Sequence, residues 1–152
     1  MRVDKKIPLI FGVPDKGFYK SLKTKEAFVA EVRPDIDGIK VVAPALLEAG
    51  VQPIVICDNM MAFCLGRGLV SAAHIFFEKK EGEAAVCRAG SLVAALCARA
   101  HKVPVYLHKG APLKKKASSL LKIDNISVTS SKIKTFVPLA ERVPLAYVTE
   151  QT

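Results

Sequence analysis

The chain has 152 residues, of which 51% are hydrophobic and 24% are charged, and its formal charge is +9. This composition predicts a folded protein, and the length fits a single domain over residues 1–152. No apolar run approaches the ~20 residues that a bilayer-spanning helix needs, and Pro8, Gly12 and Pro14 interrupt the apolar stretch near the N-terminus. We therefore expect a cytoplasmic protein with neither a membrane anchor nor a secretory signal.

Strand-like apolar runs alternate with helical segments along the chain, which favours a mostly parallel sheet with helices on its faces. Because residues 51–57 are apolar on both faces, we place that strand in the centre of the sheet. In the first half we expect strands over residues 7–12, 27–32 and 51–57, a turn at 14–17, a helix from Asp35 or Asp37 to Ala49 that Pro44 kinks and Gly50 ends, and a short helix over 59–65.

The second half continues the alternation and then loses it. The apolar stripe of residues 87–101 predicts the clearest helix of the chain. In chain order we expect a strand over 72–77, a charged loop over 78–83, that helix, a strand over 103–108, a lysine-rich helix over 113–123, a polar alternating segment over 127–135 and an edge strand over 143–149.

The four cysteines, Cys57, Cys64, Cys87 and Cys97, lie in apolar segments and never in a Cys-x-x-Cys spacing. This pattern predicts buried free thiols and neither a metal site nor a cofactor. A reactive thiolate needs an exposed and electropositive setting. Cys87, which lies beside Arg88 at the expected start of a helix, is the candidate that meets this condition.

Residues 31–38 read Glu-Val-Arg-Pro-Asp-Ile-Asp-Gly, and residues 51–58 read Val-Gln-Pro-Ile-Val-Ile-Cys-Asp. Together with the later Arg-Ala-Gly-Ser, this pattern resembles the family of the α, β and δ subunits of translation initiation factor 2B and the related isomerases of methylthioribose 1-phosphate and ribose 1,5-bisphosphate. The resemblance covers about residues 28–108. It implies a three-layer, Rossmann-like α/β fold like the family's C-terminal domain, and pairing into a homodimer.

The resemblance also implies a site at the carboxyl ends of the parallel strands, where ligands bind in such folds. Asp58 and Glu78, each at the end of an expected strand, are the candidate acid–base residues, with helix capping or simple exposure to solvent as alternative roles. Free N–H groups at a helix start favour an anion. The candidate ligand-binding residues are Glu31, Arg33, Asp58, Arg88, Gly90 and Ser91, the last three standing where the family has Lys, Gly and Thr.

The isomerases of the family use a cysteine on a loop after an early strand, but the corresponding loop, residues 13–17, has none. Phe76 and Phe77 also replace a small Gly-Ala pair. We therefore expect a noncatalytic, ligand-binding or regulatory homodimer that binds a phosphorylated sugar or nucleotide, with the apolar segments 136–139 and 143–148 at the dimer interface.

Two alternatives stay open. The first is a diverged sugar-phosphate isomerase. The second is a basic nucleic-acid-binding module, since the last 44 residues carry eight basic and three acidic side chains, a charge of +5. No aromatic residues interleave these lysines, so a platform for stacking single-stranded bases is not expected.

Overall fold

The computed structural model describes residues 5–116, 118–130 and 132–151. Its strands are β1 (Ile7–Phe11), β2 (Glu26–Ala30), β3 (Gln52–Ile56), β4 (Val70–Glu81), β5 (Ala84–Arg88), β6 (Val105–Lys109), β7 (Lys122–Ile123), β8 (Ile126–Ser127), β9 (Ala140–Pro144) and β10 (Glu150–Gln151). Its helical segments are α1 (Phe18–Ser21), η1 (Gly38–Val42), α2 (Ala43–Glu48), η2 (Asp58–Met60), α3 (Met61–Gly66), α4 (Ser91–Ala100) and η3 (Leu145–Tyr147).

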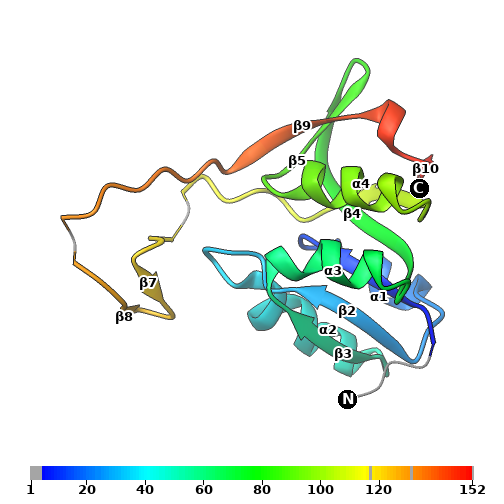
Figure 1. Cartoon of the computed structure of the whole chain (residues 1–152), viewed down its shortest axis with the longest axis horizontal. Coiled ribbons are helices and arrows are strands. Elements are labelled where there is room, and N and C mark those ends of the chain that lie inside the picture. The colour runs from blue at the N-terminus through cyan, green and yellow to red at the C-terminus, as the bar shows by residue number, and fades with distance from the viewer. Residues whose placement is uncertain (1–4, 117, 131, 152) are drawn as a thin grey trace.

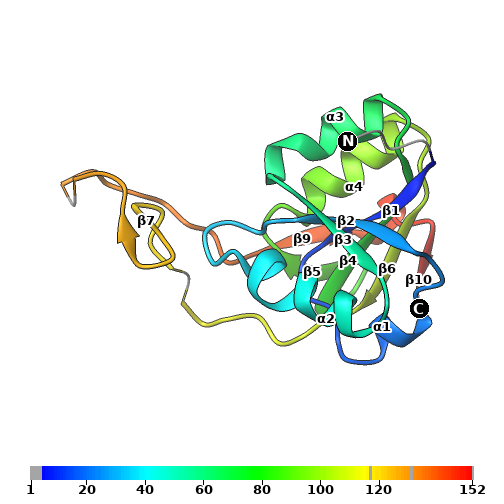
Figure 2. The same cartoon turned by 90° about the horizontal axis from the view of Figure 1, so that it is seen from below.

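Eight of the strands form one sheet in the order β10-β6-β4-β1-β2-β3, and every pair along this path is parallel. The long strand β4 also pairs antiparallel with β5, which pairs antiparallel with β9. The helices α3 and α4 pack on one face of the sheet and α1 and α2 on the other, so that two apolar cores flank it (Figure 1 and Figure 2). The expected three-layer α/β fold with a mostly parallel sheet is confirmed.

The expected central position of the strand over residues 51–57 is wrong. Within the described part of the chain β3 pairs with β2 alone and forms the edge of the sheet, where Val55 is 42% exposed. The centre belongs to β1, whose five residues are all buried, and to β4. Apolar residues on both faces show that a strand can be buried, but the crossovers between strands decide its place in the sheet.

The helix expected from Cys87 begins at Ser91 instead. Cys87 and Arg88 end strand β5, where they pair with β9. Gly90, at a φ of 103°, then turns the chain into the helix, a conformation that favours glycine. The charged loop expected over 78–83 is likewise mostly strand, because β4 continues to Glu81 and turns directly into β5.

The lysine-rich helix expected over residues 113–123 is wrong. This segment is extended, ends in the two-stranded hairpin of β7 and β8, and leaves the body of the molecule (Figure 1 and Figure 2). Three consecutive lysines repel one another, and hydrogen bonds to the loop after β2 hold the segment instead: Ser118 donates to Asp35, and the carbonyl oxygens of Leu120 and Lys122 accept from Arg33. Residue 117 of that expected helix and residue 131 of the expected polar segment lie outside the described residues.

The end of the chain returns to the sheet. The edge strand expected over 143–149 is partly confirmed, since β9 covers residues 140–144 while residues 145–147 form the helical turn η3. Val143 is fully buried in the core. Within the described residues, none of the helices has the length and apolarity needed to cross a lipid bilayer.

Gly38 lies where the loop after β2 turns back against that strand. Its backbone N–H donates to the carbonyl oxygen of Glu31, at 3.1 Å, and a side-chain carbon at this position would overlap the carbonyl oxygen of Ala30. The η1 segment that follows is a π-helix, a rare form that is frequent at functional sites. Only glycine therefore allows the loop to close this tightly.

We expect Gly38→Ala to lower the free energy of unfolding by about 3 kcal/mol or more, because the added methyl group must push backbone atoms apart. Gly17→Ala is the matched control: Gly17 has a φ of −72°, and its added methyl would meet only a side-chain oxygen of Asp15, at 3.4 Å. That variant should change stability by less than about 1 kcal/mol. Urea unfolding curves measure both, and equal losses would contradict this account.

Candidate functional site

The loop after β2 has a strained backbone that Asp58 holds in place. Val32 and Ile36 adopt φ angles of 61° and 51°, which β-branched residues avoid. The carboxylate of Asp58 accepts hydrogen bonds from the backbone N–H groups of Val32, at 2.8 Å, and of Arg33, at 2.7 Å. Strain of about 1–3 kcal/mol per residue persists only where the surroundings enforce it, and such loops are typical of functional sites.

A buried ion cluster lies next to this loop. The guanidinium of Arg88 donates to Asp35, and its second terminal nitrogen lies 2.8 Å from a carboxylate oxygen of Asp37. The side chains are 12%, 2% and 6% exposed for Arg88, Asp35 and Asp37 respectively. Asp35 and Asp37 thus bind an arginine 51 or more residues away and do not cap the following helix, which corrects our expectation.

Two residues of the extended segment after β6 complete the cluster. The amine of Lys114 lies 2.7 Å from Asp37, and Ser118 donates its backbone N–H and its hydroxyl to Asp35, at 3.0 and 2.7 Å. Burial opposes ionisation of Asp35, but the Ser118 hydrogen bonds and the charges of Lys114 and Arg88 outweigh it and hold the pKa of Asp35 below its usual value. The negative charges of Asp35 and Asp37 are therefore balanced by the positive charges of Arg88 and Lys114.

A side-chain carboxylate of the chain itself binds the backbone N–H groups at the start of α4. A carboxylate oxygen of Glu141 accepts from the backbone N–H groups of Gly90, at 2.7 Å, and of Leu92, at 2.8 Å. A side chain on Gly90 would overlap the ring of Phe11, and Ser91 is fully buried. Two of the N–H donors that we expected to meet a ligand are therefore already bonded within the chain, and Ser91 is closed off from solvent.

The two candidate acid–base residues do not meet. Asp58 follows the edge strand β3 and Glu78 lies on β4, with β1 and β2 between these strands. Glu78 is exposed and accepts from the backbone N–H of Leu113, at 3.1 Å. Asp58 uses both carboxylate oxygens on backbone groups. The expected convergence of these carboxylates on neighbouring strand ends is therefore wrong.

The two phenylalanines that replace the family's small pair point to opposite faces of the sheet. Phe76 is buried in the core under α1 and α2 and packs close to the backbones of Gly12 and Gly110. Phe77 packs against the core under α3 and α4. The two rings therefore do not fill one common space, and of the two it is Phe76 that lies against the turns at Gly12 and Gly110.

The structure does not support Cys87 as a reactive thiol. It is fully buried on β5, and burial together with the carboxylate of Glu141 raises its pKa to about 12. All four cysteines are free, but Cys57 is exposed, contrary to expectation. Among the described residues, no group of three or more His, Cys, Asp or Glu side chains is arranged to hold a metal ion.

A cavity of about 170 Å³ opens beside the ion cluster. Arg33 lines it from the loop after β2, Arg88 from the end of β5, and Lys114, Leu120 and Phe136 from the extended segment. A second cavity of about 140 Å³ is lined by Arg88, Lys114 and Phe76 among others. A larger hollow of about 660 Å³ between α1 and α2 holds no comparable cluster of charges. The candidate site is therefore the first cavity.

Of the six candidate ligand-binding residues, Arg33 and Arg88 line this cavity. Glu31 takes part in the loop through hydrogen bonds of its backbone, Asp58 is bonded to backbone N–H groups, and Gly90 and Ser91 lie at the start of α4. Sequence reasoning missed Asp35 and Asp37 as ion-pair partners. The sequence offered one signal of such partners: the Asp-Ile-Asp-Gly turn contains two carboxylates and no cation that could pair with them. It also missed Ser118 and Glu141, which come from segments with little pattern.

We expect Arg88→Ala to lower the free energy of unfolding by about 3–5 kcal/mol, because it leaves two buried carboxylates with only Lys114 to balance them. Arg142→Ala removes the same group from an exposed pair, 2.6 Å from Glu81, and should cost no more than about 1 kcal/mol. Urea unfolding at neutral pH measures both. If the two variants lose equal stability, Arg88 does not hold the cluster together.

Comparison with known proteins supports the resemblance. The model of the initiation factor 2 subunit family matches residues 15–141. A methylthioribose-1-phosphate isomerase of Carboxydothermus hydrogenoformans is 24% identical over 146 residues, which cover 86% of this chain and 43% of that protein. Its counterpart in Chloroflexus aurantiacus is 33% identical over 81 residues, covering 53% of this chain and 23% of that protein.

Solved structures show the same fold. The delta subunit of translation initiation factor eIF-2B from A. fulgidus superposes with a TM-score of 0.80 and 16% identity, covering 97% of this chain and 52% of that one. The 5-methylthioribose 1-phosphate isomerase of Pyrococcus horikoshii gives a TM-score of 0.79 at 16% identity, with coverage of 97% and 50%. The chain thus spans about half the length of these relatives or less. Since the family model matches most of its residues, the chain belongs to the initiation factor 2 subunit family.

Proposed function

We propose that this chain is a noncatalytic, ligand-binding member of its family that holds a small phosphorylated ligand in the cavity beside Arg33. The carrying observation is the state of the Arg33 guanidinium. It donates only long hydrogen bonds, of 3.4–3.5 Å, to the carbonyl oxygens of Pro34, Leu120 and Lys122. Among the described residues no carboxylate pairs with it.

A phosphate group is a better partner for this arginine than the carbonyl oxygens that it now contacts. A guanidinium and a phosphate form two parallel, charge-assisted hydrogen bonds, about twice as strong as neutral ones. Lys114 lines the same cavity with a side chain that is 48% exposed. Leu120 and Phe136 supply an apolar wall for the rest of a ligand.

The size of the cavity favours a sugar over a nucleotide. Its volume of about 170 Å³ is well below the roughly 300–1,000 Å³ of sites for drug-sized ligands. A phosphorylated pentose is compact enough for such a site. Asp35 forms part of the wall, but its carboxylate is engaged with Arg88 and Ser118, so hydroxyl groups of the sugar would meet backbone atoms more readily.

The state of the acidic residues supports the noncatalytic part of the proposal. A general acid or base must reach the atom that gains or loses a proton. Asp35 and Asp37 are bound to cations, Asp58 and Glu141 to backbone N–H groups, and Glu78 is exposed beside Leu113. The buried and half-buried carboxylates are thus already bonded within the chain, and the exposed Glu78 does not line the cavity.

The alternative, a diverged sugar-phosphate isomerase, draws its support from the names of the curated relatives, methylthioribose-1-phosphate isomerases. The two functions separate in one assay series. Incubation with methylthioribose 1-phosphate, followed by NMR, detects an isomerised product if the chain turns the compound over. Unchanged substrate, together with saturable binding, agrees with the noncatalytic proposal.

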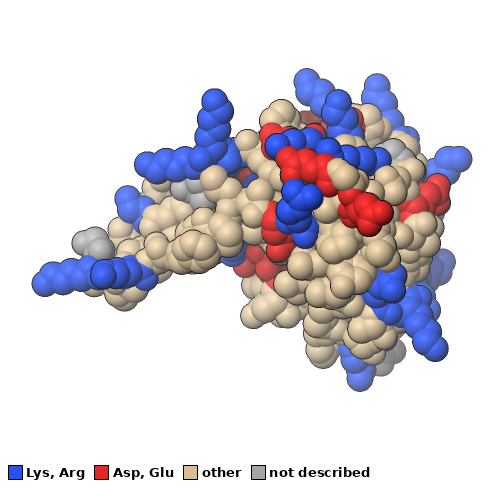
Figure 3. All heavy atoms as spheres, turned by 90° about the horizontal axis from the view of Figure 1, so that it is seen from above, with Lys and Arg blue, Asp and Glu red and all other residues tan. Residues whose placement is uncertain are grey.

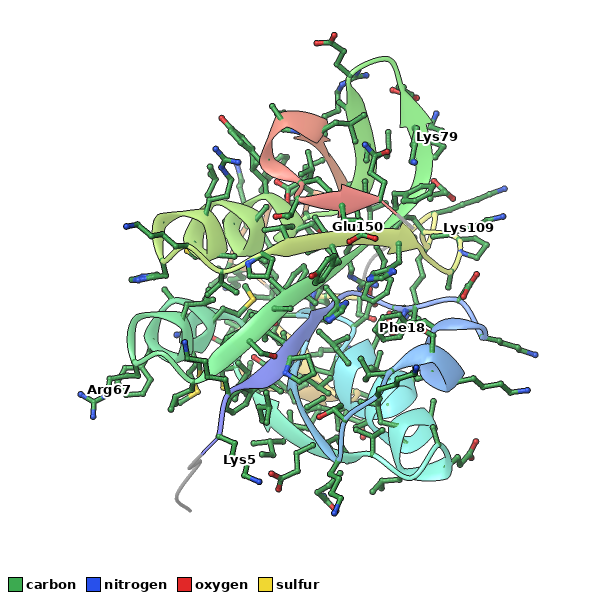
Figure 4. The ribbon with its side chains drawn as sticks, turned by 90° about the vertical axis from the view of Figure 1, so that its right-hand side faces the viewer. Lys5, Phe18, Arg67, Lys79, Lys109 and Glu150 are labelled. Carbon is green, nitrogen blue, oxygen red and sulfur yellow. The ribbon has the colours of Figure 1, made fainter. Side chains whose placement is uncertain are left out.

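We expect Arg33→Ala to weaken binding of methylthioribose 1-phosphate or ribose 5-phosphate by about 1.5–3 kcal/mol, measured by calorimetry. The matched control is Arg67→Ala. Arg67 is exposed, and it points into solvent on the side of the body opposite Lys109, which marks the carboxyl end of strand β6 (Figure 4). It should bind like the parent. Equal binding by Arg33→Ala and the parent would place the ligand elsewhere.

The homodimer expected from the sequence stays a proposal, and the exposure of Phe136 favours the segment 136–139 as its interface. Phe136 is 86% exposed, whereas Val143 is fully buried in the chain's own core. We expect light scattering at high micromolar concentration to report a dimer, and Phe136→Asp to shift it towards a monomer by placing a charge in an apolar contact. A monomeric parent chain would contradict the proposal.

A further inference from the structure

The segment that leaves the body after β6, residues 112–134, is here called the basic arm. It contains six lysines and one acidic residue, Asp124, which gives a net charge of +5. In its described residues, 112–116, 118–130 and 132–134, the arm has bends, turns and the β7–β8 hairpin but no helix, and it projects from the body in both views (Figure 1 and Figure 2). Lysine side chains stand out along the arm in the space-filling view (Figure 3).

Most of this charge is not balanced within the chain. Lys114 pairs with Asp37, and Asp124 is taken by Lys40 of the body. Among the described residues no carboxylate forms an ion pair with the other lysines of the arm, all of them exposed, which are Lys115, Lys116, Lys122, Lys132 and Lys134. A basic stripe without internal counter-charges is suited to an external polyanion.

A second copy of this chain is a poor electrostatic partner for the basic arm. Outside the arm the chain has 17 basic and 13 acidic residues, a net charge of +4. The body of another copy would therefore repel the arm over distances of about a Debye length, roughly 8 Å at physiological salt. Nucleic acid has the opposite character, since a duplex carries one negative charge per roughly 1.7 Å of its axis.

We propose that the basic arm binds the phosphodiester backbone of nucleic acid. Residues 112–134 contain no aromatic side chain, so base stacking cannot contribute from the arm, and recognition rests on phosphate contacts that carry no sequence information. The arm starts beside the ion cluster, where Ser118 donates to Asp35, and the exposed Lys122, Lys132 and Lys134 follow this anchor along the chain. Of the lysines of the arm, Lys114 alone lines the cavity beside Arg33 among the described residues, so the other five belong to a separate set of side chains.

The test is fluorescence anisotropy with a short labelled DNA duplex and the matching single strand, in KCl from about 50 to 200 mM. The arm variant changes Lys122, Lys132 and Lys134 to Gln. The matched control changes Lys5, Lys23 and Lys102 to Gln, three exposed body lysines with the same total charge. Figure 4 shows Lys5 on the body near the N-terminus.

We expect the parent and the control to bind with affinities that fall linearly with salt on a double-logarithmic plot. The arm variant should bind at least about tenfold more weakly at low salt. Its slope on the duplex should be shallower by up to about 2.7, since each phosphate that a lysine no longer neutralises removes about 0.9 from the slope. The affinities for duplex and single strand at one salt concentration show which form of the backbone the arm prefers.

The proposal fails if the arm variant binds like the parent, or if the control loses as much affinity as the arm variant, because the charge of the whole chain would then explain the binding. It also fails if the arm variant changes only the sedimentation coefficient of the free protein, which would make the basic arm a contact between copies. The Arg33→Ala variant should retain nucleic-acid binding, so this proposal and the proposed ligand site stand or fall separately.

Discussion

The ion pairs of Arg88 with Asp35 and Asp37 join three parts of the chain that are distant in sequence. They connect the end of β5 to the loop after β2, and through Lys114 and Ser118 they also hold the start of the basic arm. Because Arg88, Asp35 and Asp37 are nearly inaccessible, each charge depends on its partners. The carboxyl edge of the sheet is therefore a closed polar network, and the candidate cavity is formed beside it.

The same use of carboxylates recurs at two other points of this edge. Asp58 holds the strained backbone of Val32 and Arg33, and Glu141 satisfies the first N–H groups of α4. Buried donors must find acceptors, and here the chain supplies them internally. The acidic groups therefore hold the backbone and the cations of the site in place, whereas the guanidinium of Arg33 makes only long hydrogen bonds. This division between supporting carboxylates and one loosely bonded cation is the basis for proposing binding without turnover.

The basic arm takes part in both proposed activities through different residues. Leu120 forms part of the cavity wall, and the carbonyl oxygens of Leu120 and Lys122 contact Arg33. The exposed lysines beyond this anchor extend away from the body (Figure 3). A ligand that takes over the Arg33 guanidinium would replace its long hydrogen bonds to the carbonyl oxygens of Leu120 and Lys122. It would thereby change the contacts of the part of the basic arm that lies nearest the sheet.

Local pattern was enough to predict the α/β alternation, the strands around β1, β2 and β6, and the helix stop at Gly50, since periodicity and turn residues report burial close in sequence. The Glu-Val-Arg-Pro motif and Asp58 also indicated the family. Strand order, the start of α4 and the partners of Arg88 were not predictable in this way. They depend on contacts between residues distant in sequence: the partners of Arg88 are 51 and 53 positions away, and a charged side chain in a sequence carries no record of which distant partner will share its buried site.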